Sequence, residues 1–210
     1  MSAFLYLILP RVEDAAEFAR RLAVVLAAAP VAAVLIPSAG DDKAMGVIAR
    51  ALVPVIQQAG AAAILEQPQD ARLVARAGAD GAHYPHDAPG LAEAIATLKP
   101  QRIVGIGGLR SRHDAMQAGE RDVDYLMFGE PRADGFVPPF DQTIERAGWW
   151  ADIFNTPAVA CAADAAAVGP MAETGAEFVA LGPWIFSQPD PAGSLGEAFR
   201  LASARRKKPD

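Results

Sequence analysis

Short apolar runs alternate with longer amphipathic segments along the whole chain. Three times, a small turn and an acidic residue precede an apolar run, at residues 78–83, 122–129 and 175–182. An Ala-rich stretch that is typical of a helix comes before each of these phrases. Runs that are apolar throughout are typical of strands buried on both faces of a parallel sheet. The pattern therefore predicts a repeating β/α fold.

Eight alternations of this kind can be placed on the sequence. The predicted strands are residues 4–9, 32–36, 61–65, 81–84, 102–106, 124–128, 158–161 and 178–181. The predicted helices are residues 13–29, 42–59, 70–77, 91–98, 111–118, 140–154, 165–174 and 194–205. This count predicts an α/β chain folded as a single (β/α)8 TIM barrel domain over residues 1–210. A doubly wound open sheet is the alternative, but no Gly-x-Gly-x-x-Gly turn follows the first strand.

The barrel prediction indicates where a site should lie. Active sites of this fold lie at the C-terminal ends of the strands. The acidic residues of the recurring phrase, Asp80, Asp124 and Glu177, stand at or before the strand starts, which places them at the opposite end. We expect their carboxylates to accept hydrogen bonds from backbone N–H groups there.

Composition excludes several classes of function. The 210 residues are 52% hydrophobic and carry a net charge of −6, so no electrostatic footprint for nucleic acid is present. The basic run at residues 205–208 is interpreted as a solvated helix end. One cysteine, Cys161, permits no internal disulfide, and we expect it to be a buried, inert thiol. With neither a signal peptide nor an apolar run of membrane-spanning length, a cytoplasmic protein without membrane contact is expected.

Several motifs together resemble a known family. They are Leu-Tyr-Leu at residues 5–7, Asp-Gly-Ala-His at 80–83 followed by Asp87, Arg-Ile-Val-Gly-Ile at 102–106, and Asp-Tyr-Leu-Met-Phe-Gly at 124–129. In order and spacing they resemble the thiamine phosphate synthase and thiazole tautomerase superfamily. The resemblance implies a (β/α)8 barrel in thiamine biosynthesis. The synthases join a pyrimidine diphosphate to a thiazole phosphate with Mg²⁺, and the tautomerases isomerise a thiazole carboxylate phosphate without a metal.

This chain departs from the family where the diphosphate binds. The family's Gln, Arg and Lys after strand two fall on Leu35, Pro37 and Ala39. None of these side chains can donate a hydrogen bond or carry charge. We therefore expect diphosphate binding to be lost here. We expect this end of the barrel to bind a ligand that carries less charge than a diphosphate.

Oxygen ligands for a metal survive in altered form. The family's Asn-Asp pair after strand three falls near Glu66 and Gln67, and its Mg²⁺-binding Asp after strand four falls near Asp87. The resemblance thus implies Glu66 and Asp87 as Mg²⁺ ligands, on strand ends about 5 Å apart. His83, His86 and Asp87 form a second cluster, but a hydrogen-bonded core histidine at position 83 is the simpler interpretation.

The family's phosphate cradle uses backbone N–H groups next to glycines. Its paired glycines after strand seven become Ala162 and Ala163, and Gly182 follows strand eight. These three residues still offer N–H donors, so they are the candidate phosphate site. Asp164 stands where a helix should begin, so its carboxylate competes for the same donors.

Two further candidates follow strands five and six. Gly107, which replaces a family serine, and Gly108 form a glycine-rich turn that either admits a ligand close to the backbone or serves as a tight turn. Arg132 is the one basic residue in the loop after strand six and is the candidate side chain for anion recognition. A surface ion pair with Glu130 or Asp134 is its alternative role.

Trp149 and Trp150 follow this loop in the predicted helix at residues 140–154. The loop suggests a lid over a flat ring, whereas packing of the two indoles on the barrel or a subunit contact is the favoured interpretation. A homo-oligomer is therefore left open.

Two classes of function emerge. The first is an enzyme of thiamine phosphate synthesis with Mg²⁺ at Glu66 and Asp87. The second is an inactive or repurposed barrel that binds another small molecule at the same end.

Overall fold

The computed structural model describes residues 2–131 and 136–204. The strands are β1 (Phe4–Ile8), β2 (Ala33–Ile36), β3 (Ala62–Glu66), β4 (Gly81–Pro85), β5 (Ile103–Gly107), β6 (Tyr125–Phe128), β7 (Ala158–Ala162) and β8 (Phe178–Leu181). The α-helices are α1 (Ala15–Leu26), α2 (Asp42–Gln58), α3 (Arg72–Arg76), α4 (Leu91–Leu98), α5 (Arg112–Gly119), α6 (Phe140–Ile153), α7 (Val168–Glu173) and α8 (Pro191–Ser203). Two 3₁₀ helices, η1 (Ala165–Ala167) and η2 (Pro183–Ser187), complete the elements of the described chain.

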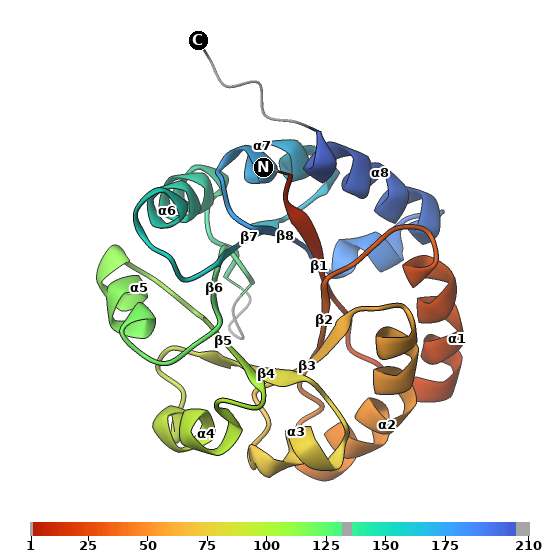
Figure 1. Ribbon diagram of the computed structural model, residues 1–210. Helices are drawn as coiled ribbons and strands as arrows, with labels where there is room; N and C mark the ends of the chain where they lie inside the picture. The colour runs from red at the N-terminus through yellow and green to blue at the C-terminus, as the bar shows by residue number, and fades with distance from the viewer. Residues whose placement is uncertain (1, 132–135, 205–210) are drawn as a thin grey trace.

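The strands close into a parallel barrel in the order β1 to β8. Each strand pairs with the next, and β8 returns to β1 through the register Leu5 opposite Val179. Figure 1 looks down the barrel axis and shows the helices as a ring around the strands. The predicted (β/α)8 barrel is therefore confirmed, and the open sheet is excluded.

Helix boundaries follow local capping chemistry. The Ser111 hydroxyl accepts from the N–H of Asp114, and the Asp114 carboxylate accepts from the N–H of Ser111, which makes a capping box at the start of α5. Helix α8 begins at Pro191, three residues before the predicted start at 194, because Asp190 caps it and proline suits a first turn. The predicted helix at 165–174 begins as η1 and continues as α7, and the turn η2 was not predicted.

The recurring acidic residues have the role that the pattern predicts. Asp80 accepts from the N–H of Ala63 at 2.8 Å, Asp124 from the N–H of Val104 at 2.7 Å, and Glu177 from the N–H of Ala158 at 2.8 Å. In each case the carboxylate before one strand binds an amide at the start of the preceding strand. A buried backbone N–H needs such a partner. These three acids therefore hold the N-terminal end of the barrel.

The helix layer and the barrel interior form two separate apolar clusters. Trp150 on α6 is 1% exposed, stacks on Phe154 with ring centroids 3.9 Å apart, and donates its indole N–H to Thr156 O at 2.7 Å. This confirms that it packs the outer helix onto the barrel. Trp149 lies against Trp150 and under the guanidinium of Arg112.

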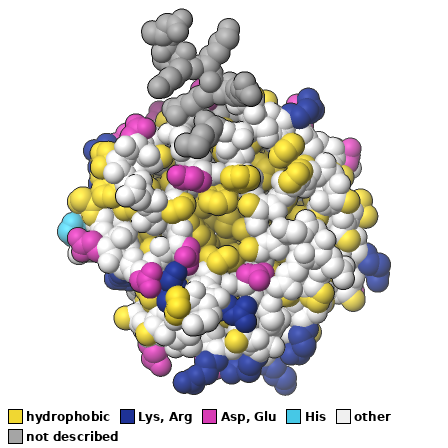
Figure 2. All heavy atoms as spheres, viewed as in Figure 1, with side chains coloured by type: hydrophobic (Ala, Val, Ile, Leu, Met, Phe, Trp, Pro, Cys, Tyr) yellow, Lys and Arg dark blue, Asp and Glu magenta, His cyan; other side chains and the backbone are white. Residues whose placement is uncertain are grey.

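The N-terminal end of the barrel is apolar at its centre. Figure 2 shows hydrophobic side chains gathered around the barrel axis, with acidic and basic side chains farther out. At the start of β1 the ring of Phe4 is 63% exposed and contacts Phe178 on β8. No helix of the described chain is long and apolar enough to cross a membrane.

Candidate active site at the barrel mouth

We call the C-terminal end of the barrel interior the barrel mouth. Because side chains alternate along a strand, every second residue points to the barrel axis. The buried interior cluster follows this rule and comprises Tyr6, Leu35, Ile64, Tyr125, Met127, Val159, Cys161 and Ala180. The same alternation places Glu66 and Gly107 at the inward positions that end β3 and β5, and His83 at the inward position before the last one of β4. No Lys or Arg occurs at an inward position of the described strands.

A hydrogen-bonded chain of three side chains crosses the interior. Tyr6 OH lies 2.9 Å from Tyr125 OH, and Tyr125 OH lies 3.1 Å from His83 Nδ1. The three side chains belong to β1, β6 and β4, and their residues are 1%, 6% and 4% exposed. The prediction of a hydrogen-bonded core histidine is confirmed. Its tyrosine partners were not predicted because they are far apart in sequence.

Gly105 makes this chain possible. It pairs with His83 on one side and with Tyr125 on the other. A Cβ at this position would overlap the Tyr125 ring. The missing side chain lets the ring lie across β5 and stack on His83, with ring centroids 5.6 Å apart.

Burial keeps the interior groups uncharged. Desolvation lowers the pKa of His83 from 6.5 to about 4, so its imidazole is neutral at pH 7. Desolvation raises the pKa values of Tyr6 and Tyr125 above the ordinary phenol value. It also raises the pKa of Cys161, with a further contribution from the charge of Glu130. The thiol of Cys161 is therefore protonated and buried, which agrees with the prediction of an inert cysteine.

Glu66 and Asp87, the predicted metal ligands, lie in different surroundings. Glu66 ends β3 at an inward position, and its Oε2 accepts from the N–H of Ser38 at 2.8 Å. Asp87 lies in the exposed loop after β4 and lines a cavity with Leu91 and Arg121. Within residues 2–131 and 136–204, no group of three or more His, Cys, Asp or Glu side chains is placed to hold a metal ion. That Glu66 and Asp87 bind one metal ion together stays a prediction. Of the two, Glu66 lies at the mouth.

The turn after β5 holds a carboxylate that the sequence analysis named only as one alternative partner of Arg132. Glu130 follows β6, and its Oε1 accepts a hydrogen bond from the N–H of Gly108. Gly108 has φ +69°, a conformation that favours glycine. A Cβ at Gly107 would overlap Glu130 Oε1 and would come within 2.7 Å of His83 Nε2. The glycine pair thus brings a backbone donor, an imidazole and a carboxylate together at the mouth.

Side chains of the protein itself lie next to the predicted phosphate cradle. The indole N–H of Trp184 donates to Ala162 O at 3.0 Å, and a Cβ on Gly182 would lie 3.1 Å from the Trp184 ring. Asp164 caps η1 by accepting from the N–H of Ala167 at 3.0 Å, a donor outside the predicted cradle, so its competition for the cradle's own donors stays a prediction. The N–H groups of Ala162, Ala163 and Gly182 stay predicted ligands of a phosphate.

The remaining predicted positions can be placed briefly. Leu35 is a buried wall of the interior cluster, and Pro37 and Ala39 follow it at the end of β2. Arg132 lies outside the described residues.

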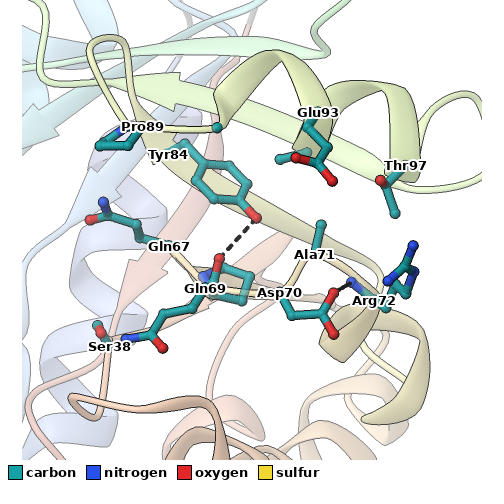
Figure 3. A pocket seen from close by; sticks show the side chains of 13 residues that line it. Ser38, Gln67, Gln69, Asp70, Ala71, Arg72, Tyr84, Pro89, Glu93 and Thr97 are labelled. Carbon is teal, nitrogen blue, oxygen red and sulfur yellow. Dashed lines mark hydrogen bonds between the residues drawn. The ribbon is translucent and has the colours of Figure 1, made fainter.

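A groove on the outer side of the barrel offers a different kind of site. It encloses about 640 Å³ between the loop after β3 and helix α4. Figure 3 shows Gln67 and Gln69 on one side and Tyr84, Glu93 and Thr97 on the other. Glu66 points to the barrel axis by the alternation of β3, and Gln67, at φ +45°, lines the groove. The groove is therefore separate from the barrel mouth.

Comparisons with known proteins agree with this geometry. The sequence model of the family described as thiamine monophosphate synthase matches residues 5–185. The thiamine-phosphate synthase of Rhodospirillum centenum is 32% identical over 201 residues, which cover 94% of this chain and 96% of that protein. The thiamine-phosphate synthase of Hyphomonas neptunium is 30% identical over 206 residues, which cover 93% of this chain and 91% of that protein.

Solved structures support the fold. Thiamine phosphate pyrophosphorylase from Pyrococcus furiosus superposes with a TM-score of 0.77 at 17% identity and covers 95% of each chain. Orotidine 5'-phosphate decarboxylase from Pyrococcus horikoshii superposes with a TM-score of 0.70 at 13% identity, with coverage of 94% of this chain and 99% of that one. The family match over most of the chain and the 32% identity show that this chain belongs to the thiamine monophosphate synthase family.

Proposed function

We propose that this member of the family is a transferase that joins a pyrimidine diphosphate to a thiazole phosphate at the barrel mouth. Two relatives that bear the name thiamine-phosphate synthase are at least 30% identical to it over more than nine-tenths of its length. The observation in the structure that carries the proposal is Glu66. It is the acidic side chain among the inward positions of the described strands, and a backbone N–H fixes one of its oxygens at the mouth.

Mg²⁺ fits such a site if the substrate supplies the other oxygens. This ion is usually held by one or two carboxylates together with phosphate oxygens and water, rather than by a cage of protein ligands. Glu66 supplies one carboxylate, and Asp87 would supply the second after its loop turns toward the axis. When bound, Mg²⁺ would neutralise charge on the departing diphosphate. That contribution matters here because the inward positions of the described strands carry no Lys or Arg.

The chain's own groups have separate roles in this proposal. The N–H groups of Ala162, Ala163 and Gly182 would bind the phosphate of the thiazole. The apolar wall that includes Leu35 and Met127 would exclude water from the carbon that loses diphosphate. The bond from that carbon to the diphosphate oxygen breaks, and the lone pair of the thiazole nitrogen forms the new bond.

A second candidate function is binding of a small molecule that carries less charge than a diphosphate. The observation that favours it is the lack of Lys and Arg at the inward positions of the described strands, where Leu35 stands in place of a family hydrogen-bond donor and the chain of Tyr6, Tyr125 and His83 is uncharged. A wall without fixed cations compensates poorly for the desolvation of a multiply charged anion.

Product formation separates the two candidates. Purified protein would be incubated with Mg²⁺, the pyrimidine diphosphate and the thiazole phosphate, and thiamine phosphate would be measured by mass spectrometry. The proposal expects product above a control without enzyme, loss of product with EDTA, and at least a tenfold lower rate for Glu66→Gln. Glu120→Ala, an exposed acid at the end of α5, is the matched control and should retain the wild-type rate. No product from the wild type at any Mg²⁺ concentration would refute the transferase and leave the second candidate.

A further inference from the structure

The Gly107–Gly108 turn has the features of an oxyanion site, and a side chain of the same protein already fills it. The N–H of Gly108 donates to the carboxylate of Glu130. Glu130 belongs to the loop after β6, and β6 is the strand next to β5 in the barrel. A single protein carboxylate thus stands where the backbone after β5 presents a donor to the mouth.

The hydrogen bond of His83 favours a second donor at the same place. Its Nδ1 faces the hydroxyl of Tyr125, which in turn faces the hydroxyl of Tyr6. If Tyr6 donates to Tyr125 and Tyr125 donates to Nδ1, each hydroxyl proton has an acceptor and the neutral ring carries its proton on Nε2. The reverse direction leaves the Tyr6 proton without an acceptor among the described residues and turns a bare Nε2 lone pair toward a carboxylate. The first arrangement is therefore the favourable one.

The two donors converge on one volume. His83 Nε2 and Glu130 Oε1 both lie within 2.7 Å of the position that a Cβ of Gly107 would take, so the glycine leaves room for both groups. The charge of Glu130 also raises the pKa values of Tyr125 and Cys161, which places it within electrostatic reach of the interior. Convergent N–H donors in a partly dry site are the usual means of binding an oxyanion.

We propose that Gly108 N–H and His83 Nε2–H form an oxyanion subsite at the barrel mouth, which the Glu130 carboxylate fills in the free protein and which a ligand oxyanion enters by displacing it. The ligand group is a carboxylate or a phosphate, because either matches two convergent N–H donors. Glu130 then acts as an internal competitor: it stabilises the free site and lowers affinity for anions. The inference concerns the same mouth as the proposed transferase and rests on that assignment of the ligand-binding end.

Anion titration tests the subsite without either thiamine precursor. Inorganic phosphate and, separately, acetate would be titrated by calorimetry into the wild type, Glu130→Ala and the control Glu120→Ala, in a chloride-poor buffer at pH 7.5. The proposal expects at least tenfold tighter binding of one of these anions by Glu130→Ala than by the wild type, about 1.4 kcal/mol. Glu120→Ala should bind like the wild type. Which anion gains affinity identifies the ligand group as phosphate or carboxylate.

A second variant and a second readout guard against misfolding. Glu130→Gln keeps the shape and removes the charge, so it should also bind the anion more tightly than the wild type. In Glu130→Ala, the amide resonance of Gly108 should shift on addition of the anion, and the further change His83→Asn should remove at least half of the gain in binding free energy. Equal affinity of the wild type, Glu130→Ala and Glu130→Gln, or an unmoved Gly108 resonance, would overturn the subsite. Either result would leave the transferase proposal standing, because synthesis of thiamine phosphate is measured separately.

Discussion

Removal of His83 should flatten the dependence of stability on pH. The imidazole is 4% exposed, and desolvation lowers its pKa from 6.5 to about 4. Between these two values the unfolded chain binds a proton at this residue and the folded chain does not. Stability from this group is therefore complete above pH 6.5 and is lost as the pH falls toward 4. Replacement by Asn removes the titrating group.

The size of the effect follows from the two pKa values. One pKa unit corresponds to about 1.4 kcal/mol, so a native pKa of about 4 implies a loss of about 2 kcal/mol for the wild type between pH 7 and pH 5. His83→Asn also breaks the hydrogen bond to Tyr125, which costs about 1–3 kcal/mol at both pH values. That cost is the same at both pH values, so it cancels when the free energy of unfolding at pH 5 is subtracted from that at pH 7 for the same protein. The difference between pH 7 and pH 5 should thus be about 2 kcal/mol smaller in the variant.

Urea unfolding at pH 7 and pH 5 measures this difference for the wild type, His83→Asn and His113→Gln. His113 is exposed on α5, so His113→Gln is the control for loss of a histidine that is not buried. Acids elsewhere, such as Asp114 with its lowered pKa, contribute equally to all three proteins. If wild type and His83→Asn lose the same free energy between the two pH values, His83 is not a neutral buried group and the reasoning fails.

Three further predictions concern other parts of the barrel. Asp124→Ala should lower the free energy of unfolding by about 2 kcal/mol in urea, because the N–H of Val104 loses its acceptor and the ammonium of Lys99 loses the nearer of two carboxylates; an unchanged value would contradict the role of the acid. Gly105→Ala should lower stability by about 1–3 kcal/mol by overpacking against Tyr125, and a melting temperature equal to that of the wild type would show that the ring can move. The thiol of Cys161 should react with a disulfide reagent far more slowly in the native protein than in urea, and equal rates would show that it is not buried.

The fold was predictable because the information for it is local. Each strand is a short apolar run next to an Ala-rich helix, so its place can be assigned without knowledge of its neighbours. The acids at 80, 124 and 177 were interpreted correctly for the same reason, since each stands next to the strand that it precedes. Errors arose where a cap moved a boundary, as at Pro191.

The site was less predictable because its contacts join residues far apart in sequence. Tyr6 and Tyr125 are 119 residues apart and meet only because the barrel closes. The role of Gly105 depends on the side chain of the next strand, and Glu130 reaches Gly108 from 22 residues away. The sequence pattern identified the glycine-rich turn as a possible ligand cradle but held no signal that an internal carboxylate would fill it.

The most direct test of the account is a crystal structure of the protein with the thiazole phosphate and Mg²⁺. The account predicts the ligand at the barrel mouth, with phosphate oxygens within hydrogen-bonding distance of backbone N–H groups at Ala162, Ala163 or Gly182. A ligand bound instead in the groove between the β3–α3 loop and α4, with an empty mouth at saturating concentration, would contradict it.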